Sequence, residues 1–471
     1  MMWGLKFLRF LWCILAFLLF VIVVVAWGVE YVPGFLKAPW GNKLGGVGNL
    51  FGLLALYTAV IMTVIGVRLP LVERAFGLDR LIRFHTALGP LVLLFAIIHV
   101  IFRTLSFSAS IGEKWSWDFL FQFFPYSWAI SENALVAARW GLLVILLSVT
   151  AAKVARLSRG FIPFRIWKPL HSMIYYGIFT AFGHSLILAS DVKRFPLLVP
   201  WAGLALVWGG CCVYRLNYLL QRSRNFRWFL EGVDYETHDV HTCRFIRPEG
   251  QGSFARRRPG QFMIIRMKSR LWGWSDPHPF TISCPPGSDS LCCTVKGVGS
   301  FSKKLRTCRP GTVFLCEGPY GIFTPDFERE KNLVFIAGGI GITPFLSMMR
   351  YVRDNSIPVS VTLIWGNRAK KDIVAYSELS RFVKSSDRFR VVHVLSEQKI
   401  TDKMREETAE DGFFWEQGLV TGSVLKKYVN PDNASFYVCG PAPMQKMVMR
   451  EIRQVFKVPP GKIRRELFVF Y

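Results

Sequence analysis

The sequence is poor in acidic residues and lacks the cysteine spacings that bind metal clusters. It holds 32 Asp and Glu against 58 Lys and Arg, and its ten cysteines form no CxxC pair and no ferredoxin-type spacing. Neither an iron–sulfur cluster nor a zinc site is therefore indicated. Internal repeats, low-complexity tracts and long Gly/Ser linkers are also missing, so the sequence indicates neither a repeat array nor loosely tethered modules.

The scarcity of acidic residues leaves a formal net charge of +26, which would suit a polyanion such as nucleic acid. Much of the excess, however, flanks long apolar segments, where membrane topology accounts for it. The remainder suits an anionic leaflet surface or a phosphate-bearing cofactor. We therefore expect a lipid bilayer as a partner, and no nucleic acid.

Long segments with little or no charge fill the first 215 residues and are absent after them. Each is close to the roughly twenty residues that a spanning helix requires. They predict six transmembrane helices and then a soluble region of about 250 residues. We expect the first helix to be retained, because its apolar stretch is long for a signal peptide. The six segments are about 10–29, 44–67, 84–102, 133–152, 169–190 and 195–214.

Basic residues concentrate in alternate loops. The 68–83 loop carries four arginines and the 153–168 loop carries five Lys or Arg, whereas each of the other loops has one or two. By the positive-inside rule, the N-terminus, both basic loops and the C-terminal region are cytoplasmic. The sequence thus predicts a multi-pass integral membrane protein.

Four histidines stand within these apolar segments. His85 and His99 lie fourteen positions apart, and His171 and His184 lie thirteen apart. At about 1.5 Å rise per residue each pair spans roughly 20 Å, so two neighbouring helices would offer one His each at two depths of the bilayer. A single buried histidine is often a structural hydrogen-bonding group. Paired imidazoles at matched separations instead favour the axial ligands of two b haems.

The unequal separations have a structural consequence. Fourteen residues bring an α-helix back to nearly the same face, but thirteen do not. The helix that carries His171 and His184 is therefore expected to bend and realign its ligands, with Gly177 and Gly183 as the candidate positions.

From about residue 230 the pattern changes to short strand-like runs between Pro, Gly and Ser, which predicts a small antiparallel barrel. Within it, residues 278–283 are HPFTIS and residues 295–302 are VKGVGSFS. An aromatic ring, hydroxyls, a cation and glycines that allow close backbone approach suit the ring and pyrophosphate of FAD. The candidate FAD-binding residues are His278, Pro279, Phe280, Thr281, Ser283, Lys296, Gly299 and Ser302.

From Lys331, strands alternate with helical segments, which predicts a parallel sheet with ligands at the carboxyl ends of its strands. The turn AGGIGITP at 337–344 follows one strand and opens a helix, where its glycines would let a pyrophosphate reach the helix amides. Two further strands end in WGNR at 365–368 and in CGP at 439–441. The candidate nucleotide-binding residues are Gly338, Gly339, Gly341, Thr343, Pro344, Gly366, Arg368, Cys439, Gly440 and Pro441.

Cations after the WGNR strand bear on the choice of nucleotide. Arg368 with Lys370 or Lys371 would favour NADPH over NADH, because a 2′-phosphate forms charge-assisted hydrogen bonds with nearby cations. The alternative for these cations is a solvated surface turn.

Taken together, these motifs resemble the NADPH oxidase and ferric reductase family of transmembrane flavocytochromes b, over nearly the whole chain. The resemblance implies a six-helix transmembrane di-haem domain at 1–220, a FAD-binding antiparallel β-barrel domain at 221–327 and an NAD(P)-binding α/β parallel-sheet domain at 328–471. It pairs His85 with His171 at the inner haem and His99 with His184 at the outer haem. No EF-hand loop is present, so calcium gating is not implied.

The resemblance also implies a route for electrons. They would pass from NAD(P)H through FAD and two b haems to an acceptor on the outer face, with no obligate protein partner. Family members usually end in an aromatic residue over the flavin, and we favour Phe470 for that role. The expected catalytic residues are Cys439, Phe470, Thr281 and Arg103.

The terminal acceptor is expected to be oxygen, which would give superoxide. Arg103 lies one helical turn beyond His99 and would stabilise the anion, and the outer loop with Trp115, Trp117 and Trp128 would restrict access to small molecules. A ferric chelate is the alternative acceptor. An alternative of another class is a haem-anchored relay subunit that serves a partner protein, but a complete nucleotide module argues against it.

Overall fold

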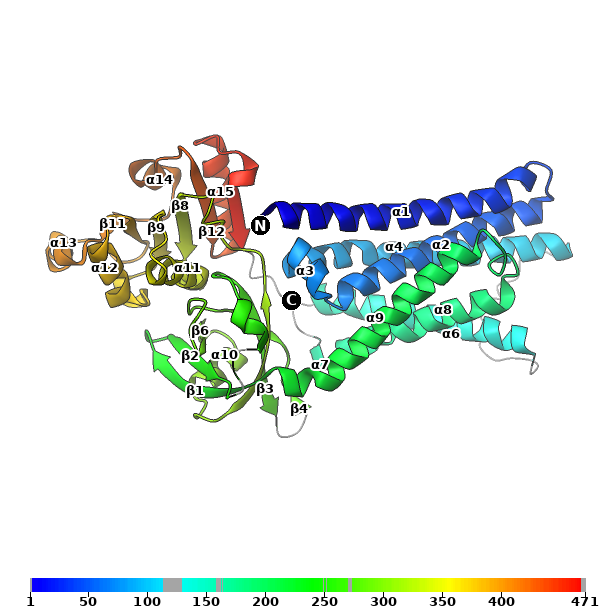
Figure 1. The fold of residues 1–471 in the computed structure, drawn as a ribbon, viewed down its shortest axis with the longest axis horizontal. Helices are drawn as coiled ribbons and strands as arrows, with labels where there is room; N and C mark the ends of the chain where they lie inside the picture. The colour runs from blue at the N-terminus through cyan, green and yellow to red at the C-terminus, as the bar shows by residue number, and fades with distance from the viewer. Residues whose placement is uncertain are drawn as a thin grey trace. The chain divides into compact units, whose positions relative to one another are not determined.

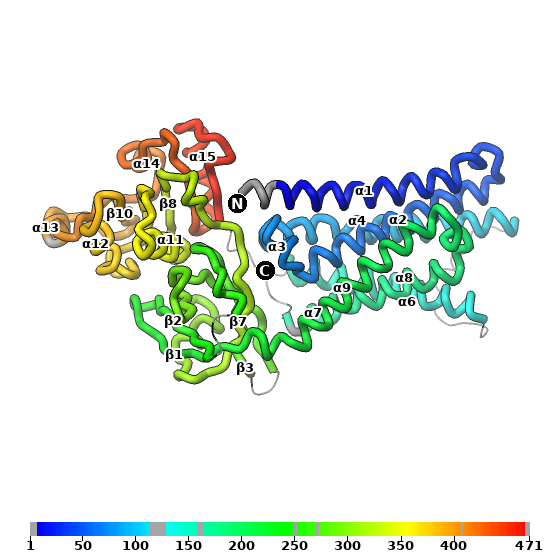
Figure 2. The backbone as a smooth tube through the Cα atoms, viewed as in Figure 1, coloured from blue at the N-terminus to red at the C-terminus, as the bar shows by residue number. Residues whose placement is uncertain are grey.

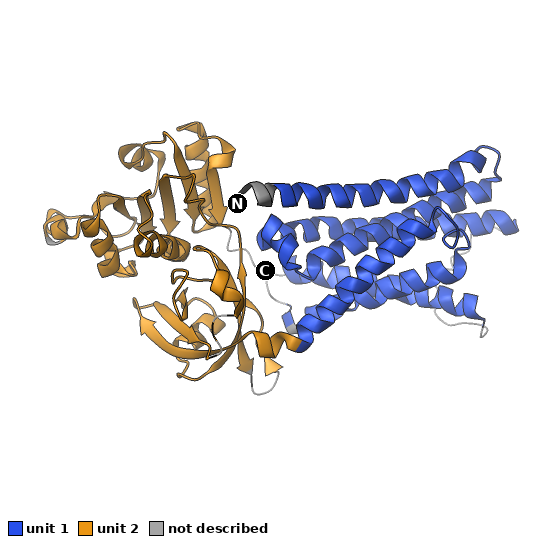
Figure 3. Cartoon of the chain, viewed as in Figure 1, with its two compact units in different colours: residues 1–220, 471 blue, residues 221–470 orange. Residues whose placement is uncertain are grey.

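The computed structural model describes residues 2–112, 129–157, 162, 164–248, 250, 252–269 and 273–466 (Figure 2). The chain divides into two compact units, residues 1–220 and residues 221–470 (Figure 3). The first unit is helical, and the second contains an antiparallel sheet followed by a parallel sheet (Figure 1). This is the order of structural classes that the sequence predicts.

The described part of the first unit is built from α1 (Met2–Phe35), α2 (Trp40–Gly66), α3 (Pro70–Phe76), α4 (Leu78–Ile111), α6 (Ile130–Leu157), α7 (Phe164–Ser172), α8 (Ile174–Leu188) and α9 (Leu198–Asn225). Five of these helices, α1, α2, α4, α6 and α9, are long and apolar enough to cross a membrane. Five of the six predicted spans thus fall on single long helices.

The predicted span at 169–190 is not one continuous helix, because Met173 separates α7 from α8. The Met173 N–H is shared between the carbonyls three and four residues before it, at 3.1 and 3.2 Å, which tightens the turn. The helix is therefore interrupted between its two histidines, as predicted, but at Met173 and not at Gly177 or Gly183, which lie inside the continuous α8. A Cβ at Gly177 would lie 2.4 Å from the Ile145 side chain, so this glycine instead lets α8 approach α6.

Glycines also bring α2 close to α4. Gly45, Gly48 and Gly52 recur at spacings of three and four residues, which places them on one face of α2. A Cβ at Gly48 would lie 3.2 Å from the Arg103 side chain, and one at Gly52 would lie 2.8 Å from Nδ1 of His99. This face of α2 therefore packs directly against Arg103 and His99, two candidate functional residues of α4.

The second unit begins with an antiparallel sheet whose strands are β1 (Arg227–Tyr235), β2 (Val240–Ile246), β3 (Phe262–Ser269), β4 (Gly273–Trp274), β5 (His278–Thr281), β6 (Leu291–Lys296) and β7 (Val313–Tyr320). The strands pair in the order β4-β3-β7-β1-β2-β6, with β5 on β3. The strand-like runs that the sequence predicts after residue 230, HTCRFIRP, GQFMIIRM, SLCCTVKGVG and GTVFLCEGP, overlap β2, β3, β6 and β7. Helix η1 (Gly252–Arg256) and helix α10 (Ser300–Arg306) accompany the sheet. Closure into a barrel stays a prediction.

A parallel sheet follows, with strands β8 (Asn332–Gly338), β9 (Ser360–Asn367), β10 (Phe389–Leu395), β11 (Phe414–Gln417), β12 (Ala434–Cys439) and β13 (Ile463–Glu466). All neighbours in the order β11-β10-β9-β8-β12-β13 are parallel. Phe335 belongs to one apolar cluster and Val334 and Ile336 to another, so both faces of the sheet are buried, as parallel sheets require. Its helices are η2 (Gly339–Ile342), α11 (Thr343–Asp354), η3 (Lys370–Asp372), α12 (Tyr376–Ser385), α13 (Asp402–Glu407), η4 (Ala409–Asp411), α14 (Gly422–Tyr428), α15 (Ala442–Gln454) and η5 (Pro460–Lys462).

Candidate functional site

The four histidines of the helical unit lie together in two pairs. The ring centroids of His85 on α4 and His171 on α7 are 6.1 Å apart. Those of His99 on α4 and His184 on α8 are 6.2 Å apart. A metal–nitrogen bond of about 2 Å on each side, plus the radius of each imidazole ring, comes close to such a separation. The two pairs are therefore spaced as the axial ligands of a metal ion would be.

The hydrogen bonds of these rings fit the same role. Nδ1 of His99 lies 2.7 Å from the carbonyl oxygen of Gly48. Nδ1 of His171 and of His184 each lie 3.3 Å from a backbone carbonyl oxygen. A metal-bound imidazole commonly donates its second N–H to such an acceptor, which fixes its tautomer and leaves Nε2 for the metal. The residues present thus fit two bis-histidine haems.

Arg103 lies one turn beyond His99 on α4, as the sequence predicts, and its side chain is exposed. It runs along the glycine face of α2, where its Nη1 lies 3.1 Å from the position of a Cβ at Gly45. Trp115, Trp117 and Trp128, which were expected to cap the outer haem, lie outside the described residues.

The candidate flavin motif places three rings in one stack. The ring centroids of His278 on β5 and Phe301 on α10 are 3.8 Å apart with planes 19° from parallel, and Phe280 lies 6.1 Å from Phe301. Burial lowers the pKa of His278, so this imidazole is neutral at neutral pH. His278 therefore offers a hydrogen-bonding group and an apolar surface rather than a cation. Phe301 is not among the flavin-binding residues predicted from the sequence.

The polar residues of this motif are partly engaged elsewhere. The Ser283 hydroxyl is fully buried and accepts a hydrogen bond from Thr294 at 3.0 Å. Lys296 pairs with Asp239 at 3.2 Å, which partly neutralises the cation expected for the pyrophosphate. Thr281 is buried at the end of β5, next to the ring stack. Gly299 and Ser302 begin α10, where the Gly299 N–H donates to the Ser302 hydroxyl at 2.9 Å.

The candidate nucleotide site lies where the strand order of the parallel sheet reverses. The chain runs from β8 to β9, β10 and β11 on one side, and then returns to β12 on the other side of β8 (Figure 1). Ligands of open α/β sheets bind at the carboxyl ends of strands at such a switch point. Gly338 ends β8 and Cys439 ends β12, so both predicted turns meet there.

These two turns pack directly against each other. A Cβ at Gly341 would lie 2.5 Å from the Cys439 carbonyl oxygen, and one at Gly440 would lie 2.9 Å from the Gly338 nitrogen. Gly440 also has φ +155°, a conformation that favours glycine. Neither position therefore accepts a side chain without moving backbone.

Gly339 differs from its neighbours in being open. It has φ +51°, and a Cβ there would meet nothing within 4 Å. The Trp365 indole N–H donates to its carbonyl at 2.9 Å from below the turn. Thr343 and Pro344 begin α11, and the Thr343 hydroxyl donates to the carbonyl of Ile340 at 3.2 Å. The turn is thus tied to β9 through Trp365 and leaves open space beside Gly339.

Cys439 and Arg368, two of the predicted nucleotide contacts, differ in their exposure. Cys439 is completely buried, and burial raises the pKa of its thiol well above its ordinary value, so any role it has is that of a neutral thiol. Gly366 lies against Val420 at the end of β9, and Arg368 is exposed two residues later. Phe470 lies outside the described residues.

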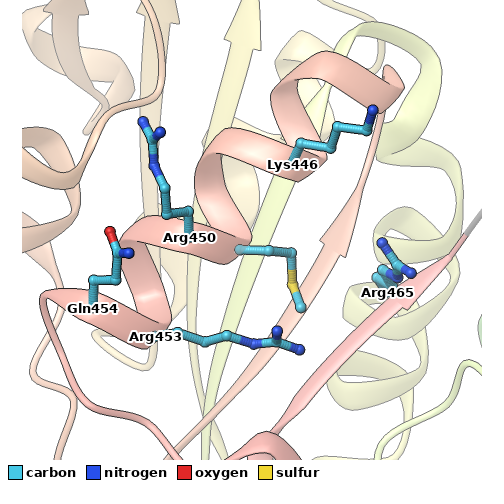
Figure 4. A pocket seen from close by; sticks show the side chains of 6 residues that line it. Lys446, Arg450, Arg453, Gln454 and Arg465 are labelled. Atoms are coloured by element: carbon cyan, nitrogen blue, oxygen red, sulfur yellow. The ribbon is translucent and has the colours of Figure 1, made fainter.

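A separate cavity of about 410 Å³ lies along α15, away from the two glycine turns. Figure 4 shows cationic side chains of α15 and Arg465 around it. It does not coincide with any residue that the motifs predict. Its lining residues are Lys446, Met449, Arg450, Arg453, Gln454 and Arg465.

Two protein families match this chain. Residues 51–182 match the ferric reductase like transmembrane component, and residues 335–450 match the oxidoreductase NAD-binding domain. The first match contains all of α4 and His171 and ends two residues before His184, and the second contains both glycine turns. The order of the two domains is the one found in ferric reductases and NADPH oxidases.

Curated relatives match about half of the chain. The flavohemoprotein of Xylella fastidiosa is 25% identical over 230 residues, which are 48% of this chain and 55% of that protein. The 2-halobenzoate 1,2-dioxygenase electron transfer component of Burkholderia cepacia is 30% identical over 40% of this chain and 52% of its own length. The chain thus spans about half the length of these relatives.

Among solved structures, the flavohem-like FAD/NAD binding domain of nitric oxide dioxygenase from Vibrio cholerae O1 biovar El Tor aligns with 51% of this chain and 98% of its own. The sequence identity is 17% and the TM-score is 0.44.

Proposed function

We propose that this chain, in which a ferric reductase-like transmembrane component is joined to an oxidoreductase NAD-binding domain, carries electrons from NAD(P)H across a membrane to an acceptor on the outer face. The assigned domains are a transmembrane di-haem domain at 1–220, a FAD domain at 221–327 and an NAD(P) domain at 328–471. The N-terminus and the dehydrogenase region are assigned to the cytoplasm, in line with the basic loops.

The observation that carries this proposal is the pairing of four histidines at two levels. Each pair takes one ring from α4 and one from α7 or α8, at 6.1 and 6.2 Å between centroids. We assign His85 and His171 to the inner b haem and His99 and His184 to the outer. The backbone acceptors of Nδ1 hold three of these rings in one tautomer, so that Nε2 is available to iron.

Electrons would enter the protein through its dehydrogenase half. A flavin bound here would supply the conversion between a two-electron hydride donor and the single electrons that haem iron accepts. Phe280 and Phe301 would pack on its ring, and the Thr281 hydroxyl would hydrogen-bond near the reacting edge. The glycine turn after β8 would hold the nucleotide pyrophosphate at the start of α11, where the positive end of the helix dipole favours an anion.

We assign oxygen, reduced to superoxide, as the acceptor. Arg103 lies one turn outward from His99 and is held along the glycine face of α2. Superoxide is an anion formed from a neutral molecule, so a fixed cation there stabilises what develops and hardly affects the binding of oxygen itself. A ferric chelate is the second candidate, since the ferric reductase like component matches residues 51–182. A relay subunit for a partner protein would not need the nucleotide turns.

The deciding experiment uses the purified full chain with haem and FAD. NADPH oxidation is measured with oxygen alone and, without oxygen, with a ferric chelate, and superoxide is scored as dismutase-sensitive reduction of cytochrome c. We expect superoxide formation, and we expect Arg103→Ala to slow it by about tenfold with both haems retained, a smaller effect than loss of a buried oxyanion donor. Lys43→Ala, which removes a charge near the same end of α2, is the matched control. Rapid ferric reduction without superoxide would replace oxygen by the ferric chelate.

A further inference from the structure

Helix α11 does more than begin with the nucleotide turn. Ser347 and Arg350 lie four and seven residues after Thr343, which places all three on one face of the helix. Ser347 is 1% exposed, so its hydroxyl is removed from solvent. The motifs predicted from the sequence include neither Ser347 nor Arg350.

Both side chains bind the backbone just after the candidate flavin strand. The Ser347 hydroxyl donates to the Cys284 carbonyl at 2.9 Å, and Arg350 Nη1 donates to the Ser283 carbonyl at 2.8 Å. These two carbonyls come two and three residues after Thr281, the last residue of β5. The helix that would hold the nucleotide is thus hydrogen-bonded to the segment that directly follows the candidate flavin strand.

The guanidinium of Arg350 is itself fixed. Glu378 on α12 accepts from its Nε at 2.9 Å and from its Nη2 at 2.6 Å, a bidentate pair. Burial acts to raise the pKa of Glu378, but the hydrogen bond and charge of Arg350 bring it below its ordinary value, so the pair stays ionised. The guanidinium is planar and rigid, and two of its nitrogens bind Glu378. The orientation of the third nitrogen, Nη1, is therefore fixed as well.

Ser283 also forms hydrogen bonds with the strand β6. The Ser283 N–H donates to the Cys292 carbonyl of β6 at 2.8 Å, and the Ser283 hydroxyl accepts from Thr294. Residues 283 and 284 therefore lie between β6 and α11 with hydrogen bonds to each. Movement of α11 relative to β5 requires these bonds to break.

We propose that Ser347 and Arg350 are positioning residues for hydride transfer. They fix the distance between the nucleotide turn and the flavin strand, because the two turns of α11 between Thr343 and Arg350 have a fixed length of about 10 Å. Hydride transfer depends steeply on such a distance, because a misplacement of about 1 Å can cost up to a hundredfold in rate. This assignment rests on the proposed function, since it requires NAD(P)H to reduce FAD in this unit.

The test separates positioning from general stability. Arg350→Gln combined with Glu378→Gln removes the grip on Ser283 without leaving one buried charge alone. Arg353→Gln is the matched control, because Arg353 lies on the same helix and also approaches Glu378, at 3.6 Å, while its Nε donates to the neighbouring Asp354 at 2.7 Å. Ser347→Ala is the milder variant should the double one fail to fold, and Arg350→Lys keeps the charge.

Flavin reduction by NADPH is followed by rapid mixing without oxygen, per mole of bound FAD, with NADPH and with NADPH deuterated at the transferred position. We expect the double variant to lose about tenfold in the rate at saturating NADPH, with FAD content and the half-saturating NADPH concentration unchanged. The isotope effect should rise, because hydride transfer becomes the slow step. Ser347→Ala should lose less, Arg350→Lys should recover part of the rate, and Arg353→Gln should match wild type.

Two results would overturn the assignment in different ways. If the double variant and Ser347→Ala reduce flavin as fast as Arg353→Gln, or lose rate only in proportion to lost FAD, the positioning role is refuted and the proposed function stands. If wild-type flavin is reduced by dithionite but by neither NADPH nor NADH, the proposed function fails, and the positioning role fails with it.

Discussion

Gly341→Ala is the sharpest test of how the nucleotide turn is built. The added methyl would lie 2.5 Å from the carbonyl oxygen of Cys439, 2.7 Å from its carbon and 2.8 Å from Cα of Gly440. Ordinary contacts between such atoms are about 3.5 Å, so the two turns must part by about 1 Å. All three neighbours are backbone atoms, which cannot rotate away. Overpacking of this kind costs about 1–3 kcal/mol.

If the strain displaces the turn rather than the sheet, the same free energy is lost from nucleotide binding. At about 1.4 kcal/mol per factor of ten, the KM for NADPH should rise roughly 5- to 150-fold. Steady-state NADPH oxidation by the purified chain measures this, with the thermal midpoint of the same sample. Gly461→Ala is the control, since a Cβ there meets nothing within 4 Å and should be neutral or stabilising by up to about 1 kcal/mol. A Gly341→Ala variant with wild-type KM and wild-type Tm would refute the reasoning.

Three further outcomes are expected. His99→Leu and His184→Leu each remove one ring of the 6.2 Å pair, so each should keep the inner haem and lose the outer one, as measured by a pyridine haemochrome assay. Unchanged haem content in both variants would contradict the ligand assignment. Arg368→Ala should raise the KM for NADPH far more than that for NADH, and equal effects would point to a structural role. Burial lowers the pKa of His393 to about 3, so the folded protein keeps this ring neutral while the unfolded chain protonates it below about pH 6.5. The free energy of unfolding therefore falls as the pH drops below about 6.5, by up to about 1.4 kcal/mol per pH unit. His393→Leu should therefore lose less Tm than wild type between pH 7 and pH 5, and parallel losses would contradict this.

Much of this architecture follows from the sequence because its signals are local. Apolar runs of about twenty residues, strand-like runs that end in glycine, and histidines at fixed separations each depend on neighbours along the chain. The glycine turn after β8 belongs to this class, since a left-handed φ at Gly339 and the close approach at Gly341 both demand glycine. The family matches at 51–182 and 335–450 agree with these readings.

Other features depend on contacts between distant residues. The break at Met173 rather than at Gly177 follows from the tightened turn there and from the packing of Gly177 on α6, which periodicity does not reveal. Likewise, Lys296 bears the expected charge, but its partner Asp239 comes from the loop between β1 and β2.

The sequence alone therefore determined which segments are apolar, which turns need glycine and which side chains have the chemistry of ligands. The tertiary structure decided which of them meet. Arg350 and Ser347 contact carbonyls 67 and 63 residues away, and no local pattern marks them, because both look like ordinary positions of an amphipathic helix. Such contacts arise only when the topology of two sheets brings a helix of one against the loop that follows a strand of the other, which is a property of the folded chain as a whole.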